Sequence, residues 1–203
     1  MSKATGKRNT GKEDALRKLG FAPGIGMRSA HVRAIAEKED DPIVWTLATE
    51  QPVMIFDWLT WDYWPEVLLM DGMVSPAVKQ VPLLDSHQRF SVKSILGSVR
   101  DFAVVDGGEY SAVEGKAYFS SVEYAQEALT KVREGHLTDG SVGYGYSDTS
   151  VVYVGEDQEV EIKGKSFVGP VKVITEWQLL EFSPCPIGAD SLAKAKDIIS
   201  GDQ

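Results

Sequence analysis

The sequence predicts a β-dominated α+β domain in which two or three helices flank a meander or barrel of short strands. Short runs rich in β-branched and aromatic residues are separated by Pro, Gly and Asp, and one segment has helical periodicity with a helix-stop residue. The composition is 43% hydrophobic and 25% charged, which is typical of a folded protein. A length of 203 residues suits one domain with flexible ends.

The first 40 residues differ from the rest in charge. They hold nine Lys/Arg against five Asp/Glu, and residues 1–14 have no apolar periodicity. We expect residues 1–40 to be a basic, largely flexible segment, in which the stretch around Arg28, His31 and Arg33 folds onto a partner or onto the domain. The domain itself is expected at residues 41–195, and residues 196–203 are expected to form a C-terminal tail.

Strand character begins at residue 43. The runs that predict strands are 43–49, 53–56, 66–70, 95–105, 110–119, 150–154, 160–162, 167–168 and 171–182. The runs 95–105 and 110–119 flank Asp106-Gly107-Gly108, which predicts a hairpin. Four aromatic residues crowd one connection, and we interpret them as a hydrophobic lid or a subunit contact rather than a carbohydrate platform: Trp58, Trp61, Tyr63 and Trp64.

One clear helix interrupts the strands. Ser120 and Glu123 have the spacing of a capping box, and Gly135 is placed to end the helix. The apolar stripe of this helix consists of Ala125, Ala128, Leu129 and Val132. A helical turn at 15–19 and an amphipathic helix at 189–199 complete the two or three helices.

Charge and cysteine content exclude several classes of protein. Beyond residue 40 the chain has 12 Lys/Arg against 25 Asp/Glu, and such an acidic body argues against specific nucleic-acid binding. A single cysteine rules out an internal disulfide framework and fits a reducing compartment such as a cytoplasm. No apolar run reaches the roughly 18 to 20 residues that a membrane span needs, and we expect no secretion signal.

Ser141 stands between small residues in Gly140-Ser-Val-Gly143. Such residues let a substrate backbone approach closely, and their main-chain N–H groups are able to stabilise an oxyanion, so Gly140, Val142 and Gly143 are candidate donors. The alternative is a structural turn in which glycine supplies unusual backbone angles. The serine alone therefore does not decide between catalysis and structure.

A serine nucleophile needs a base, and histidine suits that task at neutral pH. The chain has three histidines, His31, His87 and His136. His136 ends the predicted helix, where its charge would favour the helix dipole. His87 lies in a polar loop that follows the apolar run 81–84, so it is the better candidate for the base.

Glu181 is the candidate for the third group. Strict strand alternation places it on the same face as Trp177 and Leu179, with Leu180 and Phe182 opposite. A carboxylate on an apolar face needs a partner. It is expected to pair with Arg89 or Arg100, or else to hold the imidazole of the base; two other carboxylates, Asp85 and Asp139, are further candidates for that second role.

Other chemistries have weaker support. No histidine pair has metal-ligand spacing and the lone Cys185 lies between two prolines, so we expect no metal site and no cofactor. Cys185 as a nucleophile would need a base at its side. Ser191 and Lys194 match a Ser-x-x-Lys spacing, which we interpret as coincidental on a terminal helix.

Four segments together resemble the prohead (procapsid) serine proteases of tailed bacteriophages. They occur in the family's order and approximate spacing, and the similarity covers roughly residues 41–195. The segments are Val81-Pro-Leu-Leu-Asp-Ser-His87, Ile95-Leu-Gly-Ser-Val-Arg100, Val132-Arg-Glu-Gly-His-Leu-Thr-Asp-Gly-Ser-Val-Gly-Tyr144 and Glu181-Phe-Ser-Pro-Cys-Pro-Ile-Gly-Ala-Asp190.

The resemblance implies an antiparallel β-barrel of the type found in herpesvirus assemblins. By block matching, it implies Ser141 as nucleophile, His87 as base and Glu181 as the acidic third member. It further implies an endopeptidase, expected to be a homo-oligomer, that cleaves the phage major capsid protein, the scaffold and itself. This would take place in the host cytoplasm, inside the viral procapsid. The alternative is a non-enzymatic structural or scaffold component of the phage particle.

Overall fold

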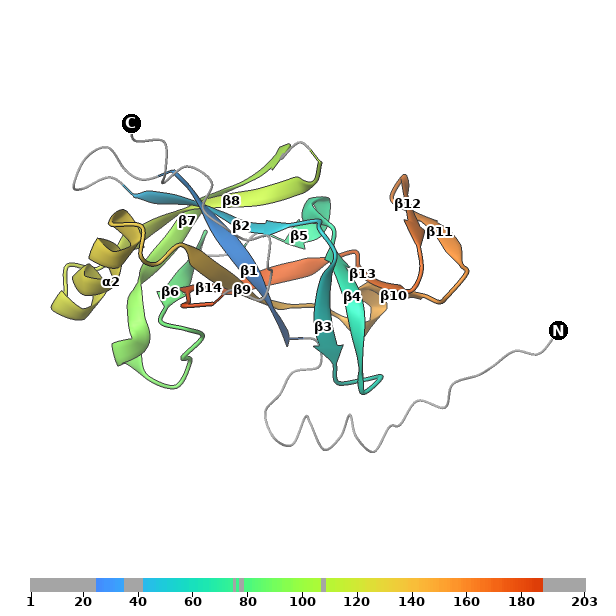
Figure 1. Ribbon diagram of the computed structural model, residues 1–203, viewed down its shortest axis with the longest axis horizontal. Coiled ribbons are helices and arrows are strands. Elements are labelled where there is room, and N and C mark those ends of the chain that lie inside the picture. Colours follow the sequence, from blue (N-terminus) through green and yellow to red (C-terminus); the bar gives the residue numbers. More distant parts are fainter. Residues whose placement is uncertain (1–24, 35–41, 75, 77–78, 107–108, 188–203) are drawn as a thin grey trace.

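The computed structural model describes residues 25–34, 42–74, 76, 79–106 and 109–187. Strands dominate these residues, and the one α-helix among them, α2 (Glu123–Arg133), lies at the left end of the molecule in Figure 1. The structure therefore confirms a β-dominated α+β class. The helical segments expected at 15–19 and 189–199, and the tail at 196–203, lie outside the described residues.

The larger sheet has eight strands in the order β5-β14-β6-β7-β8-β2-β1-β9. Because β14 also pairs with β9, the sheet curls and its pairings return to β14. All neighbours are antiparallel except β14 with β5 and β14 with β6. The strands are β1 (Ile25–Ala34), β2 (Ile43–Thr49), β5 (Met73–Val74), β6 (Gln80–Leu84), β7 (Ile95–Asp106), β8 (Ser111–Phe119), β9 (Asp139–Gly145) and β14 (Trp177–Pro184).

A smaller sheet and a separate hairpin occupy the right side of Figure 1. The small sheet contains β10 (Val151–Val154), β13 (Val171–Ile174), β4 (Asp62–Leu68) and β3 (Val53–Asp57), and the hairpin pairs β11 (Glu159–Ile162) with β12 (Lys165–Val168). Short 3-10 helices span η1 (Met70–Gly72), η2 (Val92–Ser94) and η3 (Asp148–Ser150). The run 171–182, expected as one strand, divides at Thr175 and Glu176 because the chain there leaves the small sheet for the large one.

Strand β1 lies within the segment 1–40 and includes the stretch around Arg28, His31 and Arg33. Residues 25–34 pair with β9 from Ile25 opposite Gly145 to His31 opposite Asp139, and their second half pairs with β2. This pairing agrees with the expectation that the stretch folds onto the domain, and it satisfies backbone groups of two neighbouring strands.

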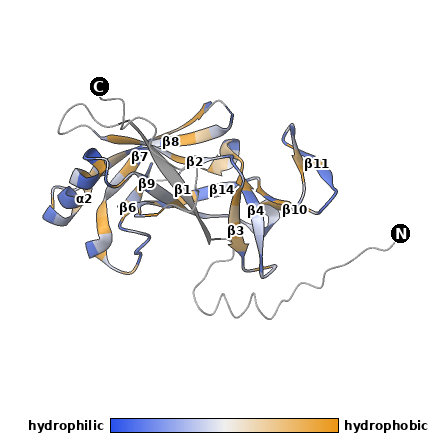
Figure 2. Ribbon diagram, in the orientation of Figure 1, coloured by the Kyte–Doolittle hydropathy of each residue, from blue (hydrophilic) through white to orange (hydrophobic). Residues whose placement is uncertain are grey.

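The core fills the inside of the curled sheet. Its largest fully buried side chains include Trp45, Tyr144, Trp177 and Phe182, and Figure 2 shows hydrophobic segments on most of the strands around it. The predicted hairpin is confirmed as β7 and β8. The members of the core that come from the helix are Ala125, Leu129 and Val132, with Ala128 partly buried beside them.

The C-terminal end of α2 agrees with the prediction, and the N-terminal end does not. Gly135 follows the helix with a φ of +75°, a left-handed conformation that glycine adopts without strain, and its N–H bonds Val132 O. The expected capping box does not form, because Val122 occupies the N-cap position without a side-chain cap bond. Ser120 instead accepts a 3.4 Å bond from the Val122 N–H.

The aromatic residues between β3 and β4 pack on one another at the surface. Trp58, Trp61 and Tyr63 each lie within 5.5 Å of the Phe56 ring, measured between centroids, and more than half of each of the three is exposed. Edge-to-face contacts hold such rings together without burying them. A subunit contact at this cluster stays a prediction.

A buried charged network joins the two sheets. Lys172 Nζ on β13 lies 3.0 Å from both Asp57 Oδ2 and Glu66 Oε2, and it donates to the Tyr146 hydroxyl at 2.7 Å. The Tyr144 hydroxyl on β9 donates to Glu66. Burial alone would lower the pKa of Lys172, but Glu66, Tyr146 and Asp57 together hold it above its ordinary value, so the side chain stays an ammonium ion.

We expect Lys172→Met to be among the most destabilising single changes in the chain. It leaves the carboxylates of Asp57 and Glu66 buried without their cation, and such a loss costs about 3 to 5 kcal/mol. Urea unfolding followed by circular dichroism measures it. Lys163→Met is the control, because Lys163 makes an exposed 3.7 Å pair with Asp71 that is worth less than about 1 kcal/mol. Equal losses in the two variants would contradict this account of the network.

Candidate active site

Ser141 lies within strand β9, not in a turn. It has a neighbour on each side, Ser29 on β1 and Ser183 on β14. A Cβ added to Gly140 would touch Phe182 and Trp45 in the core, whereas one added to Gly143 would meet Arg89 and Glu181. Because side chains alternate along a strand, Ser141 shares the outer face of the sheet with Gly143.

A bulge in β14 decides where Glu181 points. Leu179 lies opposite Tyr144 and Glu181 lies opposite Gly143, so Leu180 is an extra residue between them. Trp177 and Leu179 therefore belong to the core together with Phe182, and Glu181 turns to the outer face. The prediction that Glu181 shares the face of Trp177 and Leu179 is wrong, because strict alternation does not hold across a bulge.

The loop after β6 places His87 over this outer face. Ser86 and His87 have φ values of +47° and +61°, a left-handed conformation that non-glycine residues rarely adopt. Two main-chain N–H donors fix the loop: Ser86 N donates to the main-chain oxygen of Pro184 at 3.3 Å, and His87 N donates to the Ser183 hydroxyl at 3.0 Å. Strained backbone held in this way is typical of functional sites.

Glu181 accepts three side-chain hydrogen bonds although it is only 2% exposed. His87 Nδ1 lies 2.6 Å from Oε1, Arg89 donates to the same oxygen at 2.8 Å, and Ser183 donates to Oε2 at 2.8 Å. Burial raises the pKa of Glu181, but these bonds more than offset burial and hold that pKa below its ordinary value. The carboxylate is therefore ionised at neutral pH, and Nδ1 of the imidazole carries the proton that it shares.

Ser141 lies beside this group without a direct hydrogen bond to the imidazole. Residues directly opposite in an antiparallel pair have Cβ atoms roughly 4.5 to 5.5 Å apart, so Ser141 is a near neighbour of Ser183, which contacts both His87 and Glu181. Among the contacts of the described residues, none joins Ser141 Oγ to a His87 nitrogen. The structure thus brings His87 and Glu181 into contact and places Ser141 on the same face.

The predicted oxyanion donors have another role in the strand. Gly140, Val142 and Gly143 each have a partner on both β1 and β14. In an antiparallel sheet, each N–H group of such a residue bonds one of the two neighbours. These three residues therefore lie in an interior strand and not in a loop, and their role as oxyanion donors stays a prediction.

Gly143 nevertheless has a clear reason to be glycine. A Cβ at this position would lie 2.1 Å from the Arg89 guanidinium and 2.3 Å from Glu181 Oε1. No side chain fits there unless the ion pair between Arg89 and Glu181 moves. The small residue at position 143 thus makes room for Arg89 and for Glu181, which contacts the imidazole of His87.

Two residues of the site were not identified as such from the sequence. From the sequence, Arg89 is expected only as a structural partner of Glu181, and Ser183 has no predicted role. The spacing of Glu181 and Ser183 by two residues is the signal that would have found Ser183, because both then lie on one strand face. Arg100, the other suggested partner of Glu181, instead lies over the Tyr118 ring at 5.0 Å.

The alternative acids make contacts away from the imidazole. Asp85 accepts from Ser86 at 2.8 Å, from Gln88 at 3.2 Å and from the Tyr124 hydroxyl on α2, so it holds the loop against the helix. Asp139 accepts from Thr138 at 3.2 Å. Within the described part of the chain, neither carboxylate is bonded to the His87 imidazole.

The remaining candidates are less suited to catalysis. The His136 side chain is 74% exposed and lies 3.8 Å from Glu134 after the end of α2, which agrees with a structural position at the helix end. Burial, together with the Asp139 and Glu181 charges, raises the pKa of Cys185 to about 11, so its thiol is protonated at neutral pH. Ser191 and Lys194 lie outside the described residues.

We expect Ser183→Ala to destabilise the protein in a pH-dependent way. The variant leaves the main-chain N–H of His87 without its acceptor, and it removes a hydrogen-bond donor that lowers the pKa of Glu181. Together these losses should lower the free energy of unfolding by about 1 to 3 kcal/mol. A carboxyl with a depressed folded-state pKa contributes stability above its unfolded pKa, and that contribution is lost as pH falls through the folded value. The difference in unfolding free energy between variant and wild type should therefore become smaller as the pH falls below about 4.

The matched control for Ser183→Ala is Ser166→Ala. Ser166 also donates to a glutamate, Glu159 at 2.6 Å, but at the surface. Its removal should change stability by less than about 0.5 kcal/mol. Urea midpoints of both variants and the wild type are measured from pH 3 to pH 8. A difference between Ser183→Ala and wild type that is the same at every pH would show that the bond from Ser183 to Glu181 does not affect stability.

The described residues show no sign of a metal site or of a membrane-spanning helix, and the chain matches no known protein in three comparisons. The described residues contain no cluster of three or more His, Cys, Asp or Glu side chains arranged to hold a metal ion. No helix in the described part of the chain is long and apolar enough to cross a membrane. Comparison with protein-family models, with curated proteins and with solved structures found no match to this chain.

Proposed function

We propose that this protein is a serine endopeptidase in which Ser141 is the nucleophile, His87 the base and Glu181 the group that orients the base. The observation that carries the proposal is the 2.6 Å contact between His87 Nδ1 and a buried, ionised Glu181, on the sheet face where Ser141 lies. A histidine held by a carboxylate beside a serine is the arrangement that activates a hydroxyl. Two left-handed residues in the loop that positions His87 add support.

The chemistry follows from the tautomer that Glu181 imposes. With its Nδ1 proton directed at the carboxylate, a neutral His87 has its free electron pair on Nε2. Nε2 takes the proton as Ser141 Oγ attacks a peptide carbonyl, and the imidazolium that forms is stabilised by Glu181. The same proton then passes to the leaving amine, and water releases the acyl group in a second cycle.

The viral setting is also a proposal, and it rests on the four sequence segments that resemble prohead proteases. A curled, mainly antiparallel sheet beside one helix is compatible with the assemblin type of barrel. In that setting the substrates are the phage major capsid protein, the scaffold and the protease itself. The enzyme would then act as a homo-oligomer inside the procapsid in the host cytoplasm.

A fluorophosphonate probe tests the catalytic assignment, because it reacts with activated serine hydroxyls. We expect the wild-type chain to be labelled, and peptide mass spectrometry to place the label on Ser141 rather than Ser183. His87→Ala should abolish labelling, whereas His136→Ala, which alters the exposed histidine, should not. Labelling on Ser183, or labelling that persists in His87→Ala, would rule out the assignment.

A structural role is the second candidate, and the Arg89 contact favours it. Arg89 and Glu181 form a 2.8 Å ion pair, which by itself would satisfy a buried carboxylate without any catalysis. On that account the protein is a barrel-type structural or scaffold component of the phage particle. Normal maturation of capsid protein in the presence of Ser141→Ala would support it.

A further inference from the structure

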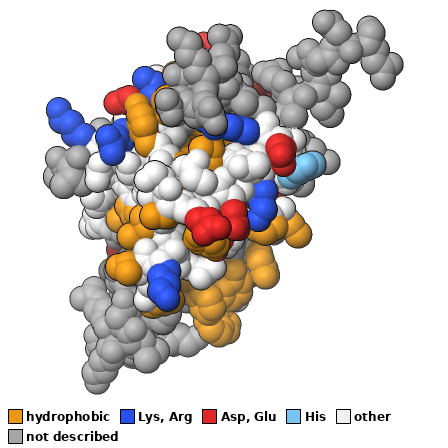
Figure 3. Space-filling model, turned by 90° about the vertical axis from the view of Figure 1, so that its left-hand side faces the viewer, with side chains coloured by type: hydrophobic (Ala, Val, Ile, Leu, Met, Phe, Trp, Pro, Cys, Tyr) orange, Lys and Arg blue, Asp and Glu red, His pale blue; other side chains and the backbone are white. Residues whose placement is uncertain are grey.

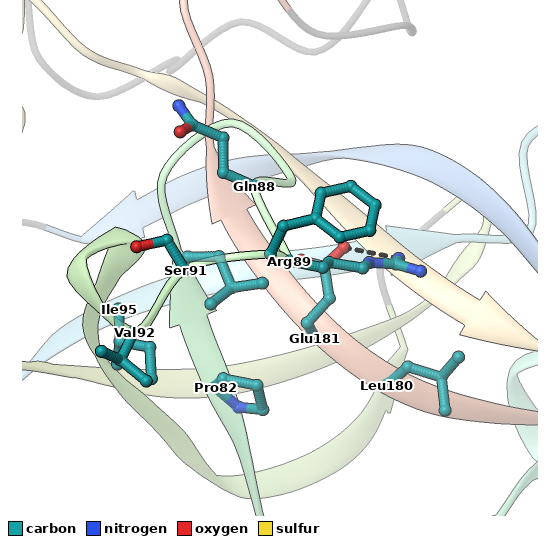
Figure 4. Close-up of a pocket in the computed structure, with 10 residues that line it drawn as sticks. Pro82, Gln88, Arg89, Ser91, Val92, Ile95, Leu180 and Glu181 are labelled. Carbon is teal, nitrogen blue, oxygen red and sulfur yellow. Dashed lines mark hydrogen bonds and ion pairs between the residues drawn. The ribbon is translucent and has the colours of Figure 1, made fainter.

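A pocket adjoins the candidate active site on the side of Arg89 and Glu181 (Figure 4). Its volume is about 480 Å³, within the range of ligand-binding pockets. Strands β6 and β14, the loop after His87 and the start of β7 form its walls. Its apolar lining consists of Pro82, Leu84, Phe90, Val92, Ile95 and Leu180.

One wall of the pocket consists of large apolar side chains that are exposed to solvent. Phe90 is 103% exposed, Val92 is 83% exposed and Ile95 is 42% exposed, and all three lie within eight residues after His87. Figure 3 shows hydrophobic side chains gathered in the lower half of the face that carries α2. Covering such surface with an apolar group is favourable because it removes apolar area from water. The wall is therefore suited to an apolar occupant.

The charges in the lining are already matched. Arg89 and Glu181 are the charged residues among those that line the pocket, and they pair with each other at 2.8 Å, as the dashed line in Figure 4 marks. The other polar lining residues, Gln88 and Ser91, are neutral. A charged side chain would lose its water here without gaining a counter-charge, which is costly. The pocket thus favours an uncharged guest.

The position of the pocket connects it to the candidate catalytic group. Leu180 and Glu181 of β14 line it, and Ser183, two residues farther along the strand, lies opposite Ser141. Two residues of extended chain span roughly 7 Å. A peptide that presents its scissile bond to Ser141 therefore brings a side chain one or two residues away within reach of this pocket.

We propose that the pocket binds a bulky apolar side chain of the peptide substrate, such as Leu, Met, Phe, Ile or Val, close to the scissile bond. Phe90 and Val92 determine that preference. The proposal rests on the endopeptidase function above and deepens it by naming the substrate class.

Digestion of a proteome-derived peptide library, with the cleaved ends read by mass spectrometry, tests the preference. We expect wild-type cleavage sites to share a bulky apolar residue at one fixed position, and Ser141→Ala to produce none of these ends. The double variant Phe90→Ser, Val92→Ser should lose the enrichment and cleave a matched apolar peptide about tenfold less efficiently, mainly through a higher KM. Val168→Ser, which alters an exposed valine on β12, is the control and should leave the profile unchanged.

The outcomes separate the two proposals. Cleavage that depends on Ser141 but shows no fixed apolar position, or a profile that the double variant leaves intact, overturns the pocket assignment while the endopeptidase function stands. Ends that appear equally with Ser141→Ala overturn the function itself.

A binding measurement tests the pocket without catalysis. In Ser141→Ala labelled at its methyl groups, N-acetyl-leucine amide should shift the NMR signals of Val92, Ile95 and Leu180, and N-acetyl-glutamate amide should not. No shift with the leucine amide, or equal shifts with both compounds, contradicts the proposed apolar site even in a protein that cleaves nothing.

Discussion

Ser141→Ala is expected to lower peptide cleavage by roughly 10⁶-fold, because the serine of a serine protease accounts on its own for about as much as its whole catalytic group. Folding should be nearly unchanged. Ser141 is 4% exposed, makes no side-chain hydrogen bond in the contacts of the described chain, and loses only a hydroxyl that alanine leaves as a small space. The measurement is kcat/KM on a peptide taken from the library digest, together with the urea midpoint.

Ser150→Ala is the control for that loss. Ser150 is also a buried serine, but it lies in η3 beside the smaller sheet and uses its main chain to bond Thr175. The Ser150→Ala variant should cleave the peptide at the wild-type rate. If Ser141→Ala retains more than about a thousandth of wild-type activity while Ser183→Ala loses it, the nucleophile has been assigned to the wrong serine of the pair.

Glu181→Gln is expected to lower cleavage by about 10⁴-fold while the protein still folds. The amide is similar in shape to the carboxylate, but it neither fixes the Nδ1–H tautomer of His87 nor stabilises the imidazolium. It also leaves Arg89 without its anion. Because the Arg89 side chain is 31% exposed, water offsets part of that cost, and we expect a loss of about 1 to 3 kcal/mol in unfolding free energy.

Asp85→Asn is the matched control for Glu181→Gln. It also neutralises a carboxylate on or beside the His87 loop, but Asp85 bonds Tyr124, Ser86 and Gln88 rather than the imidazole. It should keep cleavage within about tenfold of wild type, a range that loop adjustment accounts for. A steep loss in Asp85→Asn with activity preserved in Glu181→Gln would make Asp85 the third member instead.

The left-handed loop and the bulge in β14 together assemble the contact between His87 and Glu181. The loop is held against β14 because Ser86 N donates to Pro184 O and His87 N donates to Ser183 Oγ. The bulge turns Glu181 to the sheet face over which this loop lies.

Much of the fold could be predicted because it depends on local patterns. Strands β2, β7 and β8 follow from runs of β-branched residues, and the buried stripe of α2 follows from helical spacing. His87 and Ser141 could be selected from the sequence, since three histidines and one small-residue serine segment leave few choices. Glu181 is supported by the resemblance of the segment 181–190, whereas the strict alternation that also indicates it does not hold in β14. Their catalytic roles remain predictions.

The rest could not be predicted because it depends on pairing between distant segments. Strand β1 contains basic and small residues among its apolar ones, and backbone pairing with β2 and β9 decides its place. The presence of β1 and β14 on both sides of β9 places Gly140, Val142 and Gly143 inside the sheet, which the sequence does not show. Backbone hydrogen bonds between strands do not depend on which side chains the paired residues carry, so the sequence does not reveal them.

The sequence by itself determined the class of the fold, the stretches that form strands and the chemical types of the candidate residues, because propensity and periodicity act between near neighbours. Only the tertiary structure decided which face each of those residues occupies. One extra residue in β14 turns Glu181 outward and brings Ser183 and Arg89 to its carboxylate. The physical reason is that a bulge is set by the register of a strand with its partner, and register is a property of the assembled sheet.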